Sequence, residues 1–100
     1  MITKFIKYLK LKQSKDPKLD DYVILKTNFS DDLLNEFLDI SIGQIKEIIT
    51  NDDFPYIIKF NEIIPLYQTY QMRANKKELK YWSKNKEDLE IYLNIDKYNI

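Results

Sequence analysis

Apolar residues recur at helical spacing in two short segments near the middle of the chain. In the first segment they lie three or four positions apart, which places them on one face of a helix. That face consists of Leu33, Leu34, Phe37 and Leu38. Ser30 precedes it, and a serine hydroxyl can accept a backbone N–H that the first helical turn leaves free. The pattern predicts a helix that begins at Ser30.

The second segment repeats this spacing after a connection that consists of Asp39 and Ile40. Ser41 and Gln44 have the spacing of a capping box, and isoleucines at 42, 45, 48 and 49 line one predicted face. Together the two segments predict a helix-turn-helix over 30–51. Its expected core consists of Leu34, Phe37, Leu38, Ile40, Ile45 and Ile48.

The flanking segments predict both strands and helices. The stretches 22–27 and 56–60 are rich in β-branched and aromatic residues, so each predicts a short strand. The apolar and lysine residues of 1–11 alternate as in an amphipathic helix, and the polar stretch 13–21 predicts a loop.

Two more helices are expected towards the C-terminus. Asn61 begins one of them, with Pro65 near its first turn. Asn75 and Glu78 form a capping box for the last helix, which Ser83 or Asn85 could divide, and 95–100 predicts a loose tail. The predicted fold is therefore one α+β domain over 1–100. It is winged-helix-like, with a two- or three-stranded sheet and a C-terminal helical extension over 61–94.

The residue types exclude several kinds of chemistry. There is no histidine and no cysteine, which excludes disulfides, thiolate nucleophiles and the usual zinc ligands. Gly43 is the only glycine, so no glycine-rich phosphate loop is present. The adjacent Asp52 and Asp53 are interpreted as residues that end a helix. We expect a non-catalytic cytoplasmic protein without a metal ion or cofactor.

Charge is distributed unevenly along a chain whose formal net charge is zero. Residues 1–28 carry seven lysines and three aspartates, whereas 29–72 carry two lysines and eight acidic residues. Residues 73–86 carry six basic residues and one acid, and 87–100 are acidic again. The predicted helix-turn-helix is thus the acidic part of the chain, and the basic parts flank it.

The central stretch resembles the helix-turn-helix family, in which apolar residues recur at set intervals through both helices and the turn. Leu34, Leu38, Ile40, Ile45 and Ile48 occupy those intervals. The order of the segment 54–64, a short strand followed by a helix start, is similar to the winged variant of excisionases, MerR-type regulators and phage terminase small subunits. In size, composition and layout the chain is also similar to the small subunit that partners the A-family polymerase of staphylococcal cassette elements.

The resemblance implies a DNA-reading second helix, in which Gln44 and Lys46 would face the groove and Gln44 could pair with adenine. Phosphate contacts dominate affinity for DNA, however, and this region is acidic. The basic stretch 73–86 includes Tyr81 and Trp82, and basic residues interleaved with aromatics can follow phosphates and stack bases. We expect its DNA contacts from Arg73, Lys76, Lys77, Lys80 and Lys84.

Eight tyrosines in 100 residues are many for a domain of this size to bury. Exposed tyrosines favour protein interfaces, and Tyr67, Tyr70 and Tyr81 are the expected partner contacts. Two hypotheses follow. In the first, the chain is an accessory protein of a mobile-element DNA replication or processing complex, bound to a larger polymerase or helicase. In the second, it is a stand-alone DNA-binding regulator or excisionase.

Overall fold

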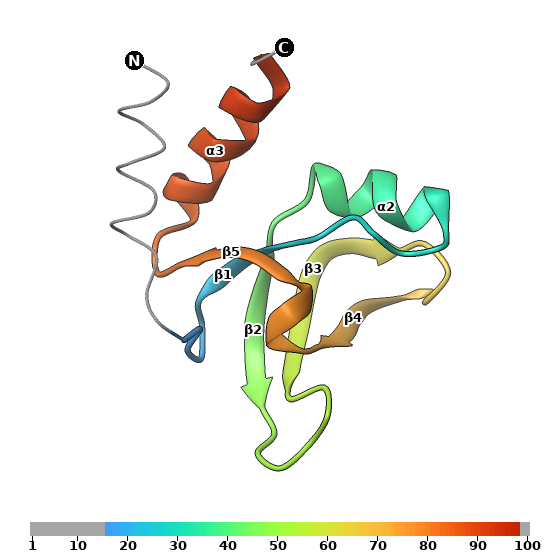
Figure 1. Ribbon diagram of the computed structural model, residues 1–100, viewed down its shortest axis with the longest axis vertical. Helices are drawn as coiled ribbons and strands as arrows, with labels where there is room; N and C mark the ends of the chain where they lie inside the picture. The colour runs from blue at the N-terminus through green and yellow to red at the C-terminus, as the bar shows by residue number, and fades with distance from the viewer. Residues whose placement is uncertain (1–15, 99–100) are drawn as a thin grey trace.

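A computed structural model describes residues 16–98 as a five-stranded antiparallel sheet with two α-helices (Figure 1). The strands are β1 (Tyr22–Leu25), β2 (Gly43–Ile48), β3 (Tyr56–Ile64), β4 (Thr69–Ala74) and β5 (Leu79–Ser83). The helices are α2 (Asp32–Asp39) and α3 (Lys86–Tyr98), and a 3-10 turn, η1 (Lys76–Glu78), precedes β5. The predicted α+β class is confirmed.

The strand order is β4-β3-β2-β1-β5, so the sheet combines a meander with one long-range pairing. Strands β2, β3 and β4 follow one another as neighbours. Strand β1 reaches β2 through α2 and also pairs with β5, the last strand in the chain. Strand β1, near the start of the described residues, therefore lies between β2 and β5, which is near their end. The sheet has five strands where two or three were predicted.

One face of the sheet and the inner side of α2 form the main hydrophobic core. The core contains residues from all five strands, and Val23, Leu38, Ile45, Ile58 and Ile64 in it are fully buried. Phe37 of α2 packs against this core, with its ring 5.3 Å from that of Phe60. The amphipathic face predicted for the first helix is therefore the face that covers the sheet.

Helix α3 packs on the opposite face, over β1 and β5 (Figure 1). Ile24 and Leu89 are buried there, and the rings of Tyr81 and Tyr92 lie 4.4 Å apart. Ser83 Oγ donates a 2.8 Å hydrogen bond to Asp88 Oδ2, which satisfies a polar pair that burial would otherwise penalise. Among the described residues, α3 covers only one end of this face and leaves the part over β2, β3 and β4 open.

The first predicted helix and both predicted strands are confirmed, with shifted ends. The N-cap of α2 is Asp31 rather than Ser30, and its Oδ1 accepts the Leu34 N–H at 2.8 Å. The strand predicted over 22–27 is β1, and the strand predicted over 56–60 continues as β3 to Ile64.

The second helix of the predicted helix-turn-helix is wrong, because Gly43–Ile48 forms strand β2. Isoleucine is β-branched and glycine is flexible, so both lower helix propensity in this segment. Ser41, expected to cap a helix, instead donates its hydroxyl to Phe37 O at the end of α2. The winged-helix arrangement is therefore not confirmed. Ile40 and Ile48, expected in the core, are 75% and 38% exposed, whereas Leu34, Leu38 and Ile45 are buried as predicted.

The helix predicted from Asn61 is also wrong, because this stretch completes β3 and returns as β4. Pro65 begins the turn between the two strands. Proline has no backbone N–H, so it cannot donate the hydrogen bond that a continued strand ladder needs. Leu66 and Gln68 both adopt positive φ in this turn, at 75° and 55°. The Gln68 N–H donates to Ile64 O at 3.0 Å and closes it.

The predicted capping box of Asn75 and Glu78 is present, but it caps only the short turn η1. Leu79–Ser83 then forms β5 instead of helix, because it pairs with β1. The C-terminal helical extension expected over 61–94 is thus limited to α3, which continues to Tyr98 through part of the predicted tail. The helix predicted over 1–11 lies outside the described residues. Neither helix of 16–98 has the length and apolar character needed to cross a bilayer.

Candidate nucleic-acid interface

A row of polar side chains crosses the open face of the sheet. The strand register pairs Tyr22 with Gln44, Gln44 with Lys59, and Lys59 with Gln71. Paired residues in antiparallel strands point to the same face. The neighbouring Val23, Ile58 and Met72 are core residues, so this row faces away from the core.

A hollow of about 270 Å³ lies along this row, between the sheet and the start of α3. Its lining includes three lysines from three elements: Lys46 of β2, Lys59 of β3 and Lys86 of α3. Tyr22, Ile42, Gly43, Gln44 and Asn61 complete the lining. We call this site the lysine hollow.

The lysine hollow is positively charged, because its lining contains three lysines and no acidic residue. Among the side chains that the structure describes, those of 16–94, Lys46, Lys59 and Lys86 form no ion pair. Their ammonium groups therefore remain available to an anion from solution. Lys46 lies at an irregularity of the β2–β3 pairing, where the register shifts between Ile45 and Glu47.

Gln44 is the most fixed polar group in the lysine hollow. Its Nε2 donates to Asp20 O at 3.1 Å, which leaves its carbonyl oxygen as the free acceptor. Asn61 is exposed and can both donate and accept. The site thus offers three cations and two amides, a set that suits phosphate and polar base edges.

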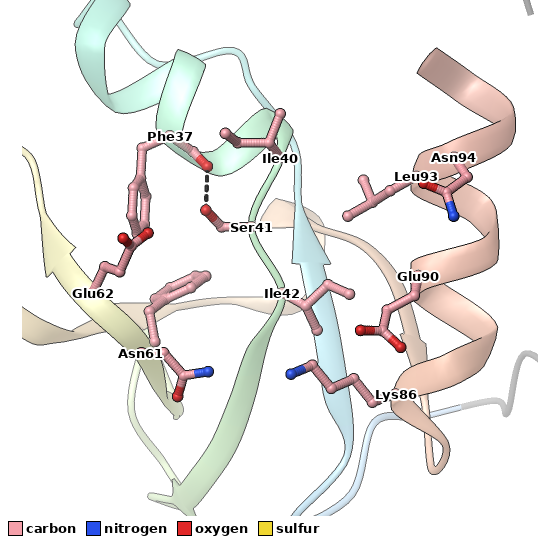
Figure 2. Close-up of a pocket in the computed structure, with 11 residues that line it drawn as sticks. Phe37, Ile40, Ser41, Ile42, Asn61, Glu62, Lys86, Glu90, Leu93 and Asn94 are labelled. Atoms are coloured by element: carbon pink, nitrogen blue, oxygen red, sulfur yellow. Dashed lines mark hydrogen bonds between the residues drawn. The ribbon is translucent and has the colours of Figure 1, made fainter. Parts of the chain in front are cut away.

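A larger hollow of about 490 Å³ adjoins it and shares Ile42, Asn61 and Lys86 (Figure 2). Figure 2 shows Lys86 and Asn61 pointing towards one another at its lower end. Above them, Ile42 faces Glu90 and Leu93 of α3. Two acidic residues, Glu62 and Glu90, line this second hollow, so the positive charge is concentrated in the lysine hollow.

The basic residues expected to bind DNA from 73–86 do not form one surface. Arg73 lies on β4 and Lys80 on β5, which are the two opposite edges of the sheet. The Arg73 side chain forms an ion pair with the β2–β3 loop, in which its Nη2 lies 2.8 Å from Asp52 Oδ1. The hydrogen bond from the Phe54 backbone N–H, followed by the one from Arg73, lowers the pKa of the Asp52 carboxyl.

The other predicted lysines are spread over three places. Lys76 Nζ lies 2.6 Å from Asp16 Oδ1, and Lys77 is exposed on the same turn. Lys80 Nζ lies 5.3 Å from the centre of the Tyr92 ring. Lys84 lines a third hollow, of about 540 Å³, beside the start of α3.

Of the sequence-predicted residues, the fold brings together Gln44 and Lys46, and it adds three that were missed: Lys59, Asn61 and Lys86. Alternation with period two in 43–48 and 56–60 could have placed Gln44, Lys46 and Lys59 on one face. The position of Lys86 depends on how α3 returns over the sheet, and no local pattern signals it.

The predicted partner contacts are divided between two environments. Tyr67 and Tyr70 are 41% and 47% exposed at the β3–β4 end of the sheet, beside Leu66 at 69%. Tyr81 instead packs against Tyr92 beneath α3. Only the first two therefore contribute to an open surface.

No family model, curated protein or solved structure matches this chain. The arrangement of the lysine hollow and of the β3–β4 turn therefore carries the functional argument.

Proposed function

We propose that this chain is a non-catalytic accessory protein that binds nucleic acid through the lysine hollow and docks on a larger protein through the β3–β4 turn. The single observation that supports nucleic-acid binding is the convergence of Lys46, Lys59 and Lys86 around a hollow without an acidic lining residue. In a chain of zero net charge, such a local concentration is what a polyanion can recognise. The proposal uses no reading helix, because Gly43–Ile48 is a strand.

Three lysines set the expected strength of binding. Each phosphate that a lysine neutralises releases counterions, and three contacts to a single strand give a slope of log affinity against log salt of about −2. Binding by the isolated chain should therefore be weak at physiological salt and tighter in dilute buffer.

Charge reversal of the lysine hollow is expected to weaken nucleic-acid binding about tenfold or more. Lys46→Glu with Lys59→Glu converts two attractions into two repulsions, each worth a fraction of a kcal/mol or more. The measurement is fluorescence anisotropy of a labelled oligonucleotide at low salt. Circular dichroism should show this double variant folded, since the side chains of Lys46 and Lys59 are exposed.

The matched control carries Lys77→Glu with Lys80→Glu, which makes the same change of charge in the stretch 73–86. We expect it to bind within about twofold of the wild type, because long-range effects of exposed charges are screened. If this control loses binding while the hollow variant keeps it, nucleic acid binds at 73–86 and the lysine hollow is not the site.

The β3–β4 turn supports the second half of the proposal. Ile63, Leu66, Tyr67 and Tyr70 are all exposed there by 41% or more, so this turn presents four large apolar side chains to solvent. Exposed apolar side chains gathered in one place are a feature of protein interfaces. Leu66 also adopts a φ of 75°, an unfavourable conformation for a bulky residue that asparagine or glycine would tolerate better. An exposed leucine in an unfavourable backbone conformation does not stabilise the folded protein, so we assign Leu66 to docking. The partner that we propose is a polymerase or helicase encoded beside this chain.

Leu66→Asn should separate docking from stability. Asparagine tolerates positive φ, so the free energy of unfolding should stay the same or rise, while the loss of an apolar anchor weakens docking at least about tenfold. Biolayer interferometry with the purified neighbouring polymerase or helicase measures the second effect. The Lys46→Glu, Lys59→Glu variant serves as control and should dock normally. Unchanged docking by Leu66→Asn would contradict this surface assignment. A neighbouring integrase would instead favour a stand-alone regulator or excisionase.

A further inference from the structure

Tyr22 lies between two neighbouring hollows on the open side of the sheet. It lines the lysine hollow and also the third hollow, where Lys84, Asn85, Lys86, Glu87 and Asp88 complete the lining. Its side chain is half-buried at the start of β1, and its register partners on either side are Gln44 and Ser83. The ring therefore stands where the two hollows meet.

Cations lie on both sides of this ring. Lys46 and Lys59 line the hollow on one side, Lys84 lines the hollow on the other, and Lys86 lines both. Glu87 and Asp88 accompany Lys84, but Asp88 is buried and accepts the Ser83 hydroxyl, so Glu87 is the exposed acid there. Excess positive charge is thus confined to the lysine hollow, with the Tyr22 ring at its border. Cations beside an aromatic ring suit a single strand, with phosphates on the cations and a base on the ring.

The shape of the site also favours a single strand over a duplex. Reading a duplex requires a helix or β-ribbon that projects into a groove. Here the lysines line hollows in the open sheet face, and α3 is held against β1 and β5 by Ile24 and Leu89. A flexible strand with unpaired bases can enter such hollows, whereas a stiff duplex meets only their rim.

On the basis of the proposed function, we propose that the lysine hollow binds single-stranded nucleic acid and that the Tyr22 ring is the platform on which one base stacks. Gln44 is the register partner of Tyr22 on β2 and keeps its carbonyl oxygen free, and Asn61 lines the same hollow, so both amides are available to the polar edge of a base. The ring and not the hydroxyl is the essential group, since stacking uses the aromatic face.

The test compares Tyr22→Leu and Tyr22→Phe by anisotropy on labelled dT12, on a twelve-base-pair duplex and on a dT12 analogue whose central residues are abasic. We expect Tyr22→Leu to weaken dT12 binding about fivefold to a hundredfold, the range for losing one stacked base. Tyr22→Phe should remain within about twofold of the wild type. The wild type should bind the abasic analogue about as weakly as Tyr22→Leu binds dT12. The comparison of dT12 with the abasic analogue on the wild type alone needs no variant.

The outcomes separate this inference from the proposed function. Equal binding of dT12 and the abasic analogue by the wild type, with binding still lost in Lys46→Glu, Lys59→Glu, overturns stacking on Tyr22 and keeps the nucleic-acid site. Tighter binding of the duplex than of dT12 overturns the single-strand assignment. Failure of the wild type to bind any of the three probes overturns the proposed function and this inference together.

Discussion

Ile45→Ala is expected to lower the free energy of unfolding by about 2–5 kcal/mol, as other large-to-small changes of fully buried isoleucines do. The Ile45 side chain is fully buried in β2, and its register partner Ile58 on β3 is fully buried too. The backbone of Ile45 bonds to Asp20 and Asp21 at 2.8 and 2.9 Å and keeps these bonds in the variant. The loss therefore comes from apolar transfer and from the cavity left between the strands.

Ile40→Ala is the matched control, because it makes the same change of side chain five positions earlier. Ile40 is 75% exposed at the end of α2, so its truncation should cost less than about 0.5 kcal/mol. Urea denaturation followed by circular dichroism measures both variants. A helix-turn-helix would bury both isoleucines, so equal and large losses would contradict the strand assignment of Gly43–Ile48.

Gly43→Ala is expected to destabilise the protein by about 1–3 kcal/mol, as overpacked cores do. Gly43 is buried at the start of β2, with the side chains of Ile58 and Phe60 directly against it. A Cβ at this position would lie 2.9 Å from Phe60 Cζ and would also clash with Ile58 Cγ2. At an unhindered site the same substitution stabilises a protein by about 0.4–1 kcal/mol, so the sign of the effect tests this contact.

Combination with Ile58→Ala isolates the clash. Truncating Ile58 removes the methyl group that meets the new Cβ, so the double variant should be less destabilised than the two single effects add up to. Chemical denaturation of the wild type, the two single variants and the double variant completes the cycle. Stabilisation by Gly43→Ala alone would show that β3 does not pack this closely on Gly43.

The sequence by itself determined the elements whose signals are local. The apolar face of 33–38 specifies α2, because helix bonds join residues four positions apart, although the cap is Asp31 and not the predicted Ser30. The β-branched stretch from Tyr22 and the run from Tyr56 specify two strands. The capping box of Asn75 and Glu78 is also local, although it caps a short turn and not the predicted helix. Burial of Leu34, Leu38 and Ile45 also followed from apolar character, whichever element carries them.

The sequence predicted only part of the candidate site, and it placed those residues on a helix that does not form. Gln44 and Lys46 were expected on a reading helix, yet they lie in the lysine hollow because they are on β2. Lys59 is thirteen positions from Lys46, and Lys86 reaches the hollow from α3. The basic stretch 73–86 was expected to act as one surface, but β4 and β5 carry it to opposite edges of the sheet.

Only the tertiary structure decided the states of 41–50, 61–73 and 79–83. Isoleucines at 42, 45, 48 and 49 fit a helical face, and one of them fits the buried side of a strand, so periodicity could not choose. The choice came from partners far away in the chain: β2 pairs with β1 and β3, and β5 closes on β1 more than fifty residues earlier. The hydrogen bonds of a strand join such distant segments. The local sequence pattern of one segment therefore does not reveal how strongly it pairs with the other.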